Sequence, residues 1–431
     1  MRSAFLKLVV IVLAVAGLAW AAPGQFSAQK RIGLTTGDQW EPALSADGSG
    51  HIYVLYPHYG AVPDCKNDAC IAPTMLLVVS NDNGKTWQTP RVVLDSGSGQ
   101  YDAQIVVDPA DRRTVYAAWL QNRKRVVMLA KSVDSGANWS FNIAVRSEVE
   151  LDKPVLAVRG QRVVLGFNHE EDVWVAASQD GGHSFTNTQV NSEARPGWSL
   201  LGGATIDPAG NAYLAWTSYS KAGGARGPVN LYVSKSSDAG KTWDPNLLDV
   251  SAAAQGCDDE DCGEAYLGAQ ISLASDAGGT LYALWTSGSK RLGPQRIYFS
   301  SSTNGGDSWL PRVSVSLAAR GVEHAFPALV AGSAGDVRVA WMDTRNGNET
   351  RSPQQWNTYY RSSNNGGATW SPESRLSSYV PGYRYIGKKG FHFPFGDYFG
   401  IAIDNHDDTH VVWGEGMNYQ SPGSIWYAGG R

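Results

Sequence analysis

An eight-residue motif recurs six times along this 431-residue chain, and its spacing limits the folds that the chain can adopt. The motif has the form S-x-D-x-G-x-x-W, and its copies occupy residues 80–87, 132–139, 178–185, 236–243, 302–309 and 363–370. The closing aromatic residues of successive copies are separated by 52, 46, 58, 66 and 61 residues. Periods of this length are typical of architectures in which each repeat is one small β-sheet.

Each residue type in the motif suits a tight turn between two strands. An Asp or Asn side-chain oxygen accepts backbone N–H groups of its own turn, and Gly adopts positive φ. The closing aromatic ring is buried where the chain re-enters the sheet. Asn304 and Asn365 replace the Asp in two copies, so the turn needs an acceptor and not a charge. We therefore interpret the motif as structural rather than catalytic or metal-binding.

The segments around the motifs repeat one order of elements from residue 40 to the end of the chain. A module consists of a strand, a tight turn, a second strand, a variable loop, a third strand, the motif turn and an outer strand. Five of the seven modules have a Trp in the second strand, namely Trp119, Trp216, Trp285, Trp341 and Trp413. The seventh module lacks its outer strand, whereas residues 30–36 form a strand candidate without a module.

These modules predict an all-β fold, a single β-propeller with seven four-stranded blades. Pairing of residues 30–36 with the last blade would close the ring and remove exposed sheet edges. Six blades is the alternative count, which would apply if module three or module seven were not a true blade.

The eight-residue motif resembles the Asp-box, or bacterial neuraminidase repeat, of the sialidase superfamily. The resemblance implies a β-propeller that covers residues 22–431. Sialidases are six-bladed propellers, so the count of seven departs from that family. The resemblance is specific for architecture and carries little information about activity.

The composition favours a well-packed β protein without a nucleic-acid partner. Charged residues make up only 18% of the chain, which holds 48 Gly, 16 Trp and 19 Tyr. Such values are typical of a turn-rich, aromatic β fold. The net charge of -4, without any long basic run, provides no surface for a phosphate backbone.

Residues 1–21 have the pattern of a secretory signal peptide. Arg2 and Lys7 precede an apolar run at 8–18 and a small-residue cleavage site at 19–21. The run is shorter than the roughly 20 residues that a membrane span needs. We expect the mature chain to begin near Ala22, to be secreted or periplasmic, and to have no membrane span.

The four cysteines form two local pairs, each with four intervening residues. In an oxidising compartment such pairs favour disulfides over a metal site. Three connectivities are possible, and we predict the local ones, Cys65 with Cys70 and Cys257 with Cys262.

An acidic run lies between the second pair of cysteines and includes Asp258, Asp259 and Asp261. Calcium is possible there because it binds carboxylate oxygens. The spacing matches no EF-hand loop, so a solvated acidic turn is the preferred interpretation and no cofactor is predicted.

Strand direction assigns the turns and loops of a propeller to two rims. The turns after first strands and the motif turns are short and must share one rim, here called the turn rim. The loops after second strands and those that enter the next blade are long and lie on the opposite rim, here called the loop rim. Binding residues concentrate on such loops, so we expect function at the loop rim.

The resemblance to sialidases implies three arginines that hold a sugar carboxylate, a tyrosine nucleophile paired with an acid, and an aspartate acid/base. The family's first arginine lies in an F/Y-R-I-P motif, and the matching segment 39–44 keeps Pro42 but has Trp40 at the arginine position. The family's tyrosine opens the last inner strand, which corresponds to Tyr398 with Asp397 beside it. The alternative is that Asp397 caps a turn and Tyr398 packs in the channel wall.

Module six contributes further candidates on the loop rim. Asp343 and Arg345 follow its second strand directly, where they could act as an acid and a carboxylate clamp or simply pair with each other. Glu323 and His324 stand at the entry to the same module. A His among carboxylates is either a ligand or merely solvated.

The segment 379–395 mixes aromatic and cationic residues, and its binding candidates are Arg384, Phe391, His392 and Phe393. Aromatic rings stack on sugar faces, and cations hold acidic groups. We expect either a glycan or peptide platform, to which Trp40 could contribute, or a set of rings that seals the channel mouth.

Two functions follow from the sequence. The first is an exported sialidase-like propeller that binds a glycan or protein ligand through the loop rim. The alternative is an exo-acting, sialidase-like glycoside hydrolase with Tyr398 as nucleophile and Asp397, Asp343 and Arg345 nearby.

Overall fold

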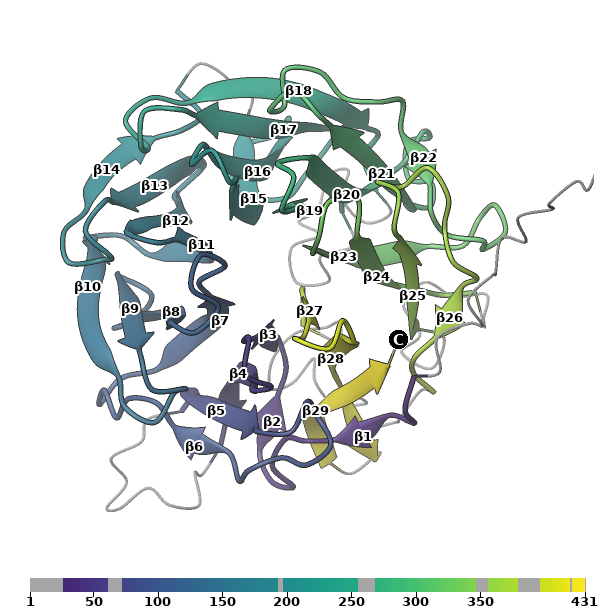
Figure 1. Cartoon of the computed structure of the whole chain (residues 1–431). Helices are drawn as coiled ribbons and strands as arrows, with labels where there is room; N and C mark the ends of the chain where they lie inside the picture. The colour runs from purple at the N-terminus through teal and green to yellow at the C-terminus, as the bar shows by residue number, and fades with distance from the viewer. Residues whose placement is uncertain are drawn as a thin grey trace, which may run out of the picture.

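The computed structural model shows a ring of seven antiparallel β-sheets around a central channel (Figure 1). It describes residues 26–60, 72–192, 197–254, 268–345, 356–378, 396–418 and 421–430. All secondary-structure elements among these residues are strands. The predicted all-β propeller with seven blades is thus confirmed, and the six-bladed alternative is excluded.

The strands of each blade follow one another along the chain. Blade I contains β3 (Ala43–Ala46), β4 (Ile52–Tyr59), β5 (Thr74–Ser80) and β6 (Arg91–Val92), with β2 (Asp38–Gln39) added beside β4. Blade II contains β7 (Gln100–Val107), β8 (Val115–Gln121), β9 (Val126–Ser132) and β10 (Ser140–Arg146). Blade III contains β11 (Leu151–Arg159), β12 (Arg162–His169), β13 (Asp172–Ser178) and β14 (Thr186–Gln189). Blade IV contains β15 (Trp198–Ile206), β16 (Ala212–Tyr219), β17 (Val229–Ser236) and β18 (Asp244–Ser251).

The remaining three blades repeat this order. Blade V contains β19 (Ile271–Ser275), β20 (Leu281–Ser287), β21 (Arg296–Ser302) and β22 (Val313–Ser314). Blade VI contains β23 (His324–Ala331), β24 (Val337–Asp343), β25 (Asn357–Ser363) and β26 (Ser374–Arg375). Blade VII contains β27 (Gly400–Ile403), β28 (Thr409–Asn418), β29 (Ser421–Gly430) and β1 (Lys30–Arg31).

The core of the molecule is divided into seven layers, one between each pair of neighbouring blades. A hydrophobic cluster fills each of these interfaces. The second strands are buried on both faces, which explains their continuous apolar runs. Their five tryptophans are at most 1% exposed. Burial on both faces therefore fixes each blade between its two neighbours.

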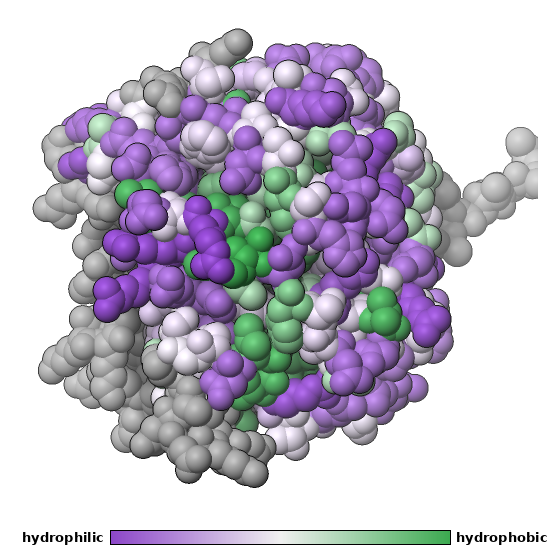
Figure 2. All heavy atoms as spheres, turned by 90° about the vertical axis from the view of Figure 1, so that its left-hand side faces the viewer, coloured by the Kyte–Doolittle hydropathy of each residue, from purple (hydrophilic) through white to green (hydrophobic). Residues whose placement is uncertain are grey.

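The outside of the ring is mainly polar. Viewed toward the side that carries β10 and β14, the surface is hydrophilic over most of its area and is crossed by a hydrophobic band (Figure 2). Val133 and Phe141 of blade II are among the large apolar side chains that remain exposed. The described residues include no helix with the length and hydrophobicity that a transmembrane span requires.

The N-terminal strand closes the ring, as the sequence predicts. Lys30 and Arg31 of β1 pair antiparallel with Tyr427 and Trp426 of β29. The pairing continues through the N–H of Ile32, which donates to the carbonyl oxygen of Ile425 at 2.9 Å. The outer strand of blade VII thus comes from the opposite end of the chain.

The six motif turns share one hydrogen-bond pattern. In the first copy the Ser80 hydroxyl accepts the N–H of Gly84 at 2.9 Å, and Asp82 Oδ1 accepts the N–H of Thr86 at 2.8 Å. The Thr86 hydroxyl also donates to Asp82 Oδ2 at 2.6 Å. Hydrogen bonds within the turn hold the pKa of Asp82 at about 2.

The two Asn copies keep the geometry of the turn. In these copies the Asn amide donates to the Ser or Thr hydroxyl, whereas in the Asp copies the residue at that position donates to the carboxylate. Asn304 Oδ1 accepts the N–H of Ser308 at 3.0 Å, while Asn304 Nδ2 donates to the Ser308 hydroxyl at 2.9 Å. Asn365 makes the same pair of contacts with Thr369. An acceptor is therefore sufficient, as expected from the sequence.

The motif turns and the turns after first strands lie on the same rim. The N–H of Asn83 donates to the carbonyl oxygen of Gly50, and its amide donates to Asp404 at 2.6 Å. Gly50 and Asp404 both belong to turns that follow inner strands. The opposite rim is left to the loops that enter the inner strands.

Substitutions of Ile32 test the closure of the ring. Ile32 is 7% exposed and packs in the cluster between blades VII and I. We expect Ile32→Val to lower the free energy of unfolding by about 1 kcal/mol and Ile32→Ala by about 2–4 kcal/mol, because each removes buried methyl groups. Urea unfolding measures both, and an Ile32→Ala protein as stable as wild type would contradict closure by this strand.

Acid titration of stability tests the motif turns. Hydrogen bonds hold the pKa of Asp82, Asp134 and Asp238 at about 2 in the folded protein, below the value of about 3.9 in an unfolded chain. The stabilisation from these carboxylates is therefore complete above pH 4 and is lost as the pH falls toward 2. We expect the triple Asp→Asn variant, which copies Asn304 and Asn365, to lose less stability than wild type between pH 4 and pH 2. Equal losses in urea unfolding series would contradict this account.

Candidate functional site

The inner strands carry irregular backbone at the ends that face the loop rim. Strands β7, β11, β15 and β23 each shift register against the neighbouring strand near their first residues. Glu41, Asp102, Lys153 and Phe326 occupy corresponding positions and have positive φ values of 53°, 57°, 46° and 56°. Bulges re-aim side chains, and non-glycine residues in this conformation store strain that clusters at functional sites.

These strand ends surround a cavity of about 230 Å³ in the central channel. Its polar lining comes from blades II, III, IV, V and VII, and consists of Asp102, Gln104, Lys153, Thr217, Gln270, Ser272, Asp397 and Tyr398. None of the described residues that line the cavity is an arginine. The carboxylate clamp that a resemblance to sialidases implies is therefore not formed by these residues.

Two lysines connect the carboxylates around this cavity. Lys153 donates a hydrogen bond to Asp397 and lies 3.8 Å from Asp102 Oδ1. Lys124 lies 3.1 Å from Asp152 Oδ1 and 3.9 Å from Asp102 Oδ2. Asp102 is thus shared between the two ammonium groups, and the network links blades II, III and VII.

Glu41 is buried beside this network and is 2% exposed. Burial raises the pKa of Glu41 to about 8, against the attraction of Lys153. The Glu41 carboxyl is therefore protonated at neutral pH. Its Oε1 atom makes no hydrogen bond, and the same holds for Asp102 Oδ2 and Asp397 Oδ1. A buried acceptor without a donor is costly, so the described residues do not fully satisfy the carboxyl groups around the cavity.

Tyr398 lines the cavity next to Asp397. Its hydroxyl donates to the carbonyl oxygen of Ala103 at 3.3 Å, and Lys153 Nζ lies 5.9 Å from the centre of its ring. Burial raises the pKa of Tyr398 well above its ordinary value, and the charges of Asp102 and Asp152 add to this shift. A tyrosine nucleophile needs the opposite shift or a neighbouring base.

Gly396 allows Asp397 and Tyr398 to approach blade I. Its φ is 74°, and a Cβ atom at this position would lie 2.5 Å from Glu41 Cγ and 3.4 Å from Trp40 Cβ. Trp40 is 2% exposed and packs on Tyr59 with ring centres 4.6 Å apart. Trp40, which stands at the family's arginine position, therefore packs behind Glu41.

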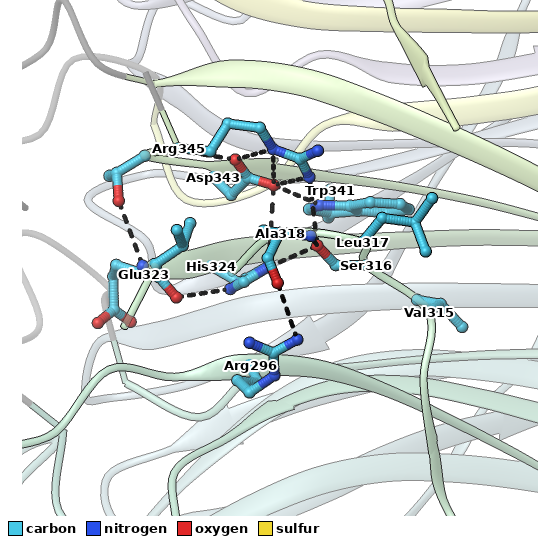
Figure 3. Close-up of polar contacts among 12 residues, drawn as sticks. Arg296, Val315, Ser316, Leu317, Ala318, Glu323, His324, Trp341, Asp343 and Arg345 are labelled. Carbon is cyan, nitrogen blue, oxygen red and sulfur yellow. Dashed lines mark hydrogen bonds and ion pairs between the residues drawn. The ribbon is translucent and has the colours of Figure 1, made fainter. Parts of the chain in front are cut away.

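Asp343 and Arg345 belong to a different network, which does not line the cavity. Figure 3 shows the Arg345 side chain lying against Asp343, with His324 and Ser316 beside them. Arg345 donates to Asp343 through Nε at 2.9 Å and Nη2 at 2.6 Å, and also donates to Glu373. The structure therefore pairs Asp343 with Arg345 and does not bring them to Tyr398.

The role of Asp343 is explained by equivalent residues in other blades. Trp341 Nε1 donates to Asp343 Oδ2 at 2.9 Å. In blade II, Trp119 makes the same contact with Gln121 at 3.2 Å, and in blade VII, Trp413 makes it with Glu415 at 2.9 Å. In each case, the residue two positions after the buried Trp satisfies its indole N–H.

His324 and Glu323 are buried at the entry to blade VI. His324 Nδ1 faces the carbonyl oxygens of Gln295 and Val322 at 3.0 and 2.9 Å, so it carries the ring proton, and Nε2 accepts from Ser316 at 2.8 Å. Burial lowers the pKa of His324 to about 4, and the ring is neutral at physiological pH. Glu323 Oε1 accepts the N–H of Gln295 at 3.0 Å, and burial raises its pKa well above the ordinary value.

Several predicted residues lie outside the described part of the chain. They are Cys65, Cys70, Cys257, Cys262, Asp258, Asp259, Asp261, Arg384, Phe391, His392 and Phe393, together with the predicted signal segment 1–21. The disulfides, the possible calcium site and the aromatic platform therefore stay predictions.

A group of possible metal ligands occurs on the turn rim, where Asp404, His406 and Asp408 lie with ligand atoms within 4.8 Å of one another. Asp404 Oδ1 already accepts the N–H groups of His406 and Asp408, at 2.8 and 2.9 Å. Asp404 Oδ2 accepts from Asn83. The carboxylate therefore serves the turn, as Asp47 does in blade I.

Sequence reasoning missed Glu41, Asp102, Lys153 and Gln270. A weak signal was present, because Glu41, Lys153 and Phe326 each precede a proline near the start of an inner strand. The bulges at these positions cannot be recognised from the alternation of apolar and polar residues along a strand alone.

The fold and the repeated turns define an Asp-box β-propeller. The chain matches the BNR repeat-like domain over residues 6–256, and it belongs to this family. A comparison with curated proteins gave no match.

Solved structures show the same fold at low sequence identity. A protein of unknown function from Dyadobacter fermentans DSM 18053 is 13% identical with a TM-score of 0.52, over 94% of this chain and 99% of that chain. A polysaccharide lyase, an ulvan lyase, is 12% identical with a TM-score of 0.51, over 92% and 95%. The Hadza microbial sialidase Hz136 is 15% identical with a TM-score of 0.46, over 91% and 65%. The Dyadobacter protein and the ulvan lyase, at identities this low, show a common fold only.

Substitution of Asp343 separates a structural role from a role in the channel. We expect Asp343→Ala to lower the free energy of unfolding by about 2–4 kcal/mol, because it leaves the Trp341 indole unpaired and removes a partner of Arg345. Asp343→Asn keeps an acceptor and should cost less. Urea unfolding measures both variants. Ligand binding at the channel should stay at the wild-type level in Asp343→Asn, and its loss would contradict the structural assignment.

Proposed function

We propose that this chain is an exported sialidase-like propeller that binds a glycan at the loop-rim end of its channel. The observation that carries the proposal is the cavity of about 230 Å³, with Asp102 and Asp397 at its wall. Each of these two residues retains a carboxylate oxygen that makes no hydrogen bond. Sugar hydroxyls supply the donors that such acceptors need.

The fold supports this choice without establishing it. An ulvan lyase of similar fold has been solved bound to a disaccharide repeat of glucuronic acid and sulfated rhamnose. A propeller of this size can therefore present a saccharide site in another protein. Binding residues on loops held by a rigid ring are the general pattern. A peptide is the other ligand class that the sequence leaves open, and it is included in the experiment below.

Binding should be measured on a glycan array and a peptide library, followed by calorimetry. We expect Asp102→Asn and Asp397→Asn to weaken glycan binding about tenfold or more, since hydrogen bonds to charged groups contribute about 1.5–3 kcal/mol. Asp82→Asn on the turn rim is the matched control and should bind like wild type. Binding of peptides but not of glycans would overturn the proposal. An equal loss of glycan binding in all three variants would also overturn it.

A second candidate is the exo-acting glycoside hydrolase with Tyr398 as nucleophile. The position of Tyr398 in the cavity wall beside Asp397 favours it, whereas the hydrogen bond to Ala103 and the raised pKa oppose it. A panel of fluorogenic glycosides tests it. Hydrolysis by wild type that is lost in Tyr398→Phe would establish catalysis, and we expect no turnover in either protein.

Export is tested separately. N-terminal sequencing of the protein recovered outside the cytoplasm should give Ala22 as the first residue, and recovery of the uncleaved chain would overturn this part of the proposal.

A further inference from the structure

The described residues around the cavity carry more carboxylates than ammonium groups. The carboxyl groups are Glu41, Asp102, Asp152 and Asp397, and the ammonium groups are Lys124 and Lys153. Because Glu41 is protonated at neutral pH, the balance is three carboxylates against two ammonium groups, which leaves one carboxylate in excess. Opposite charge on a ligand is the complement that such an excess favours.

Asp102 and Asp397 line the cavity, and Glu41 lies beside them. Glu41, Asp102 and Asp397 are 2%, 5% and 4% exposed, respectively. In each residue one oxygen makes no hydrogen bond. Lys153 binds Asp397 Oδ2 and approaches Asp102 Oδ1, while Lys124 lies 3.9 Å from Asp102 Oδ2 without a hydrogen bond to it. A group with several N–H donors and a positive charge would satisfy the oxygens that make no hydrogen bond, and an ammonium group has three donors.

The walls already accept ammonium groups over aromatic faces. Lys153 and Tyr398 both line the cavity, and Lys153 Nζ lies 5.9 Å from the ring centre of Tyr398. Outside the cavity lining, Lys124 Nζ lies 5.5 Å from the ring centre of Tyr101. Carboxylates combined with aromatic faces are the usual surroundings of a bound amine. The chain's own lysines therefore show which chemical group fits these walls.

We infer that the channel site selects a ligand with a protonated amine, and that its glycan contains amino sugars whose amines are not acetylated. This inference rests on the proposed glycan binding and specifies its ligand class. It also departs from the arginine clamp of sialidases, which binds a carboxylate.

Ionisation of Glu41 provides a signature of amine binding that a neutral ligand would not produce. Lys153 and Lys124 favour its ionised form, whereas burial, Asp102 and Asp152 oppose it, and the balance raises its pKa to about 8. Tyr59 and Tyr398 are the other titratable groups coupled to Glu41. An incoming ammonium would stabilise the Glu41 carboxylate, so binding should release a proton from this group.

Three tetrasaccharides that differ at one ring position test the inference. The probes are β-1,4-linked glucosamine, N-acetylglucosamine and glucose, which present an amine, an acetamide and a hydroxyl, respectively. Calorimetry at pH 6 keeps the amines protonated. We expect the glucosamine tetramer to bind about tenfold tighter than either of the others, as one charge-assisted contact predicts. Titrations in two buffers with different ionisation enthalpies should show proton release with the glucosamine tetramer only.

Asp102→Asn supplies the protein side of the test. Asp102 has a φ of 57°, which Asn tolerates, so this variant keeps the backbone. It should lose the preference for the amine while retaining weak binding of all three probes. Asp82→Asn should keep the wild-type preference.

The outcomes distinguish this inference from the proposed function. Equal or stronger binding of the glucose or N-acetylglucosamine tetramer would overturn the amine preference and leave glycan binding intact. A preference for the amine that persists unchanged in Asp102→Asn would also overturn it. Absence of binding to every glycan on the array would instead overturn the proposed function.

Discussion

The pairing of β1 with β29 is the contact on which the ring depends. Blade VII takes its first three strands from the end of the chain and its outer strand from the beginning. Every layer of the core lies between two blades, so a blade that lost this strand would weaken both of its interfaces. The inner strands are edge strands of their sheets, and the closed ring encloses these edges in the channel, which allows inner strands as short as the four residues of β3 and β27 to persist.

The closed ring also determines where chemistry can occur. Seven inner strands run in the same direction through the channel, so their starting ends meet at the loop rim. The turn rim is constrained by hydrogen bonds such as those of Asp82 and Asp404, which use the carboxylate oxygens completely. At the loop rim the bulges of β7 and β11 interrupt the regular pattern. At this end Glu41, Asp102 and Asp397 each have a buried oxygen without a hydrogen bond.

The sequence predicted the architecture more fully than the site. Six copies of one turn establish the period, and the strand candidate at residues 30–36, which has no module of its own, predicted the pairing of β1 with β29. The same regularity explains why Asp343 was ambiguous. Its position two residues after Trp341 is a packing solution shared with Gln121 and Glu415, and this becomes visible only when the strands are superposed in register.

The residues around the cavity could not be predicted from the sequence, for a physical reason. Glu41, Asp102 and Lys153 lie at bulges, where alternation between faces fails, and each comes from a different blade. Tyr398 and Asp397 were found because a family resemblance points to the start of the last inner strand. Resemblance supplied the position and gave no information about the charge around it, which depends on neighbours from three other blades.

The inferred preference for an amine would place a cation where a sialidase-like site holds an anion. A sialidase-like site holds an anion with arginines, whereas this site has Trp40 in the wall and a protonated Glu41 behind Asp102. The substitution of a large apolar ring for a cation removes a positive charge from a buried place. It also lets Glu41 remain uncharged there until a cation approaches. Burial opposes ionisation of Glu41. A bound cation would offset this cost, whereas an anion or a neutral group would not, so selectivity follows from desolvation as much as from attraction.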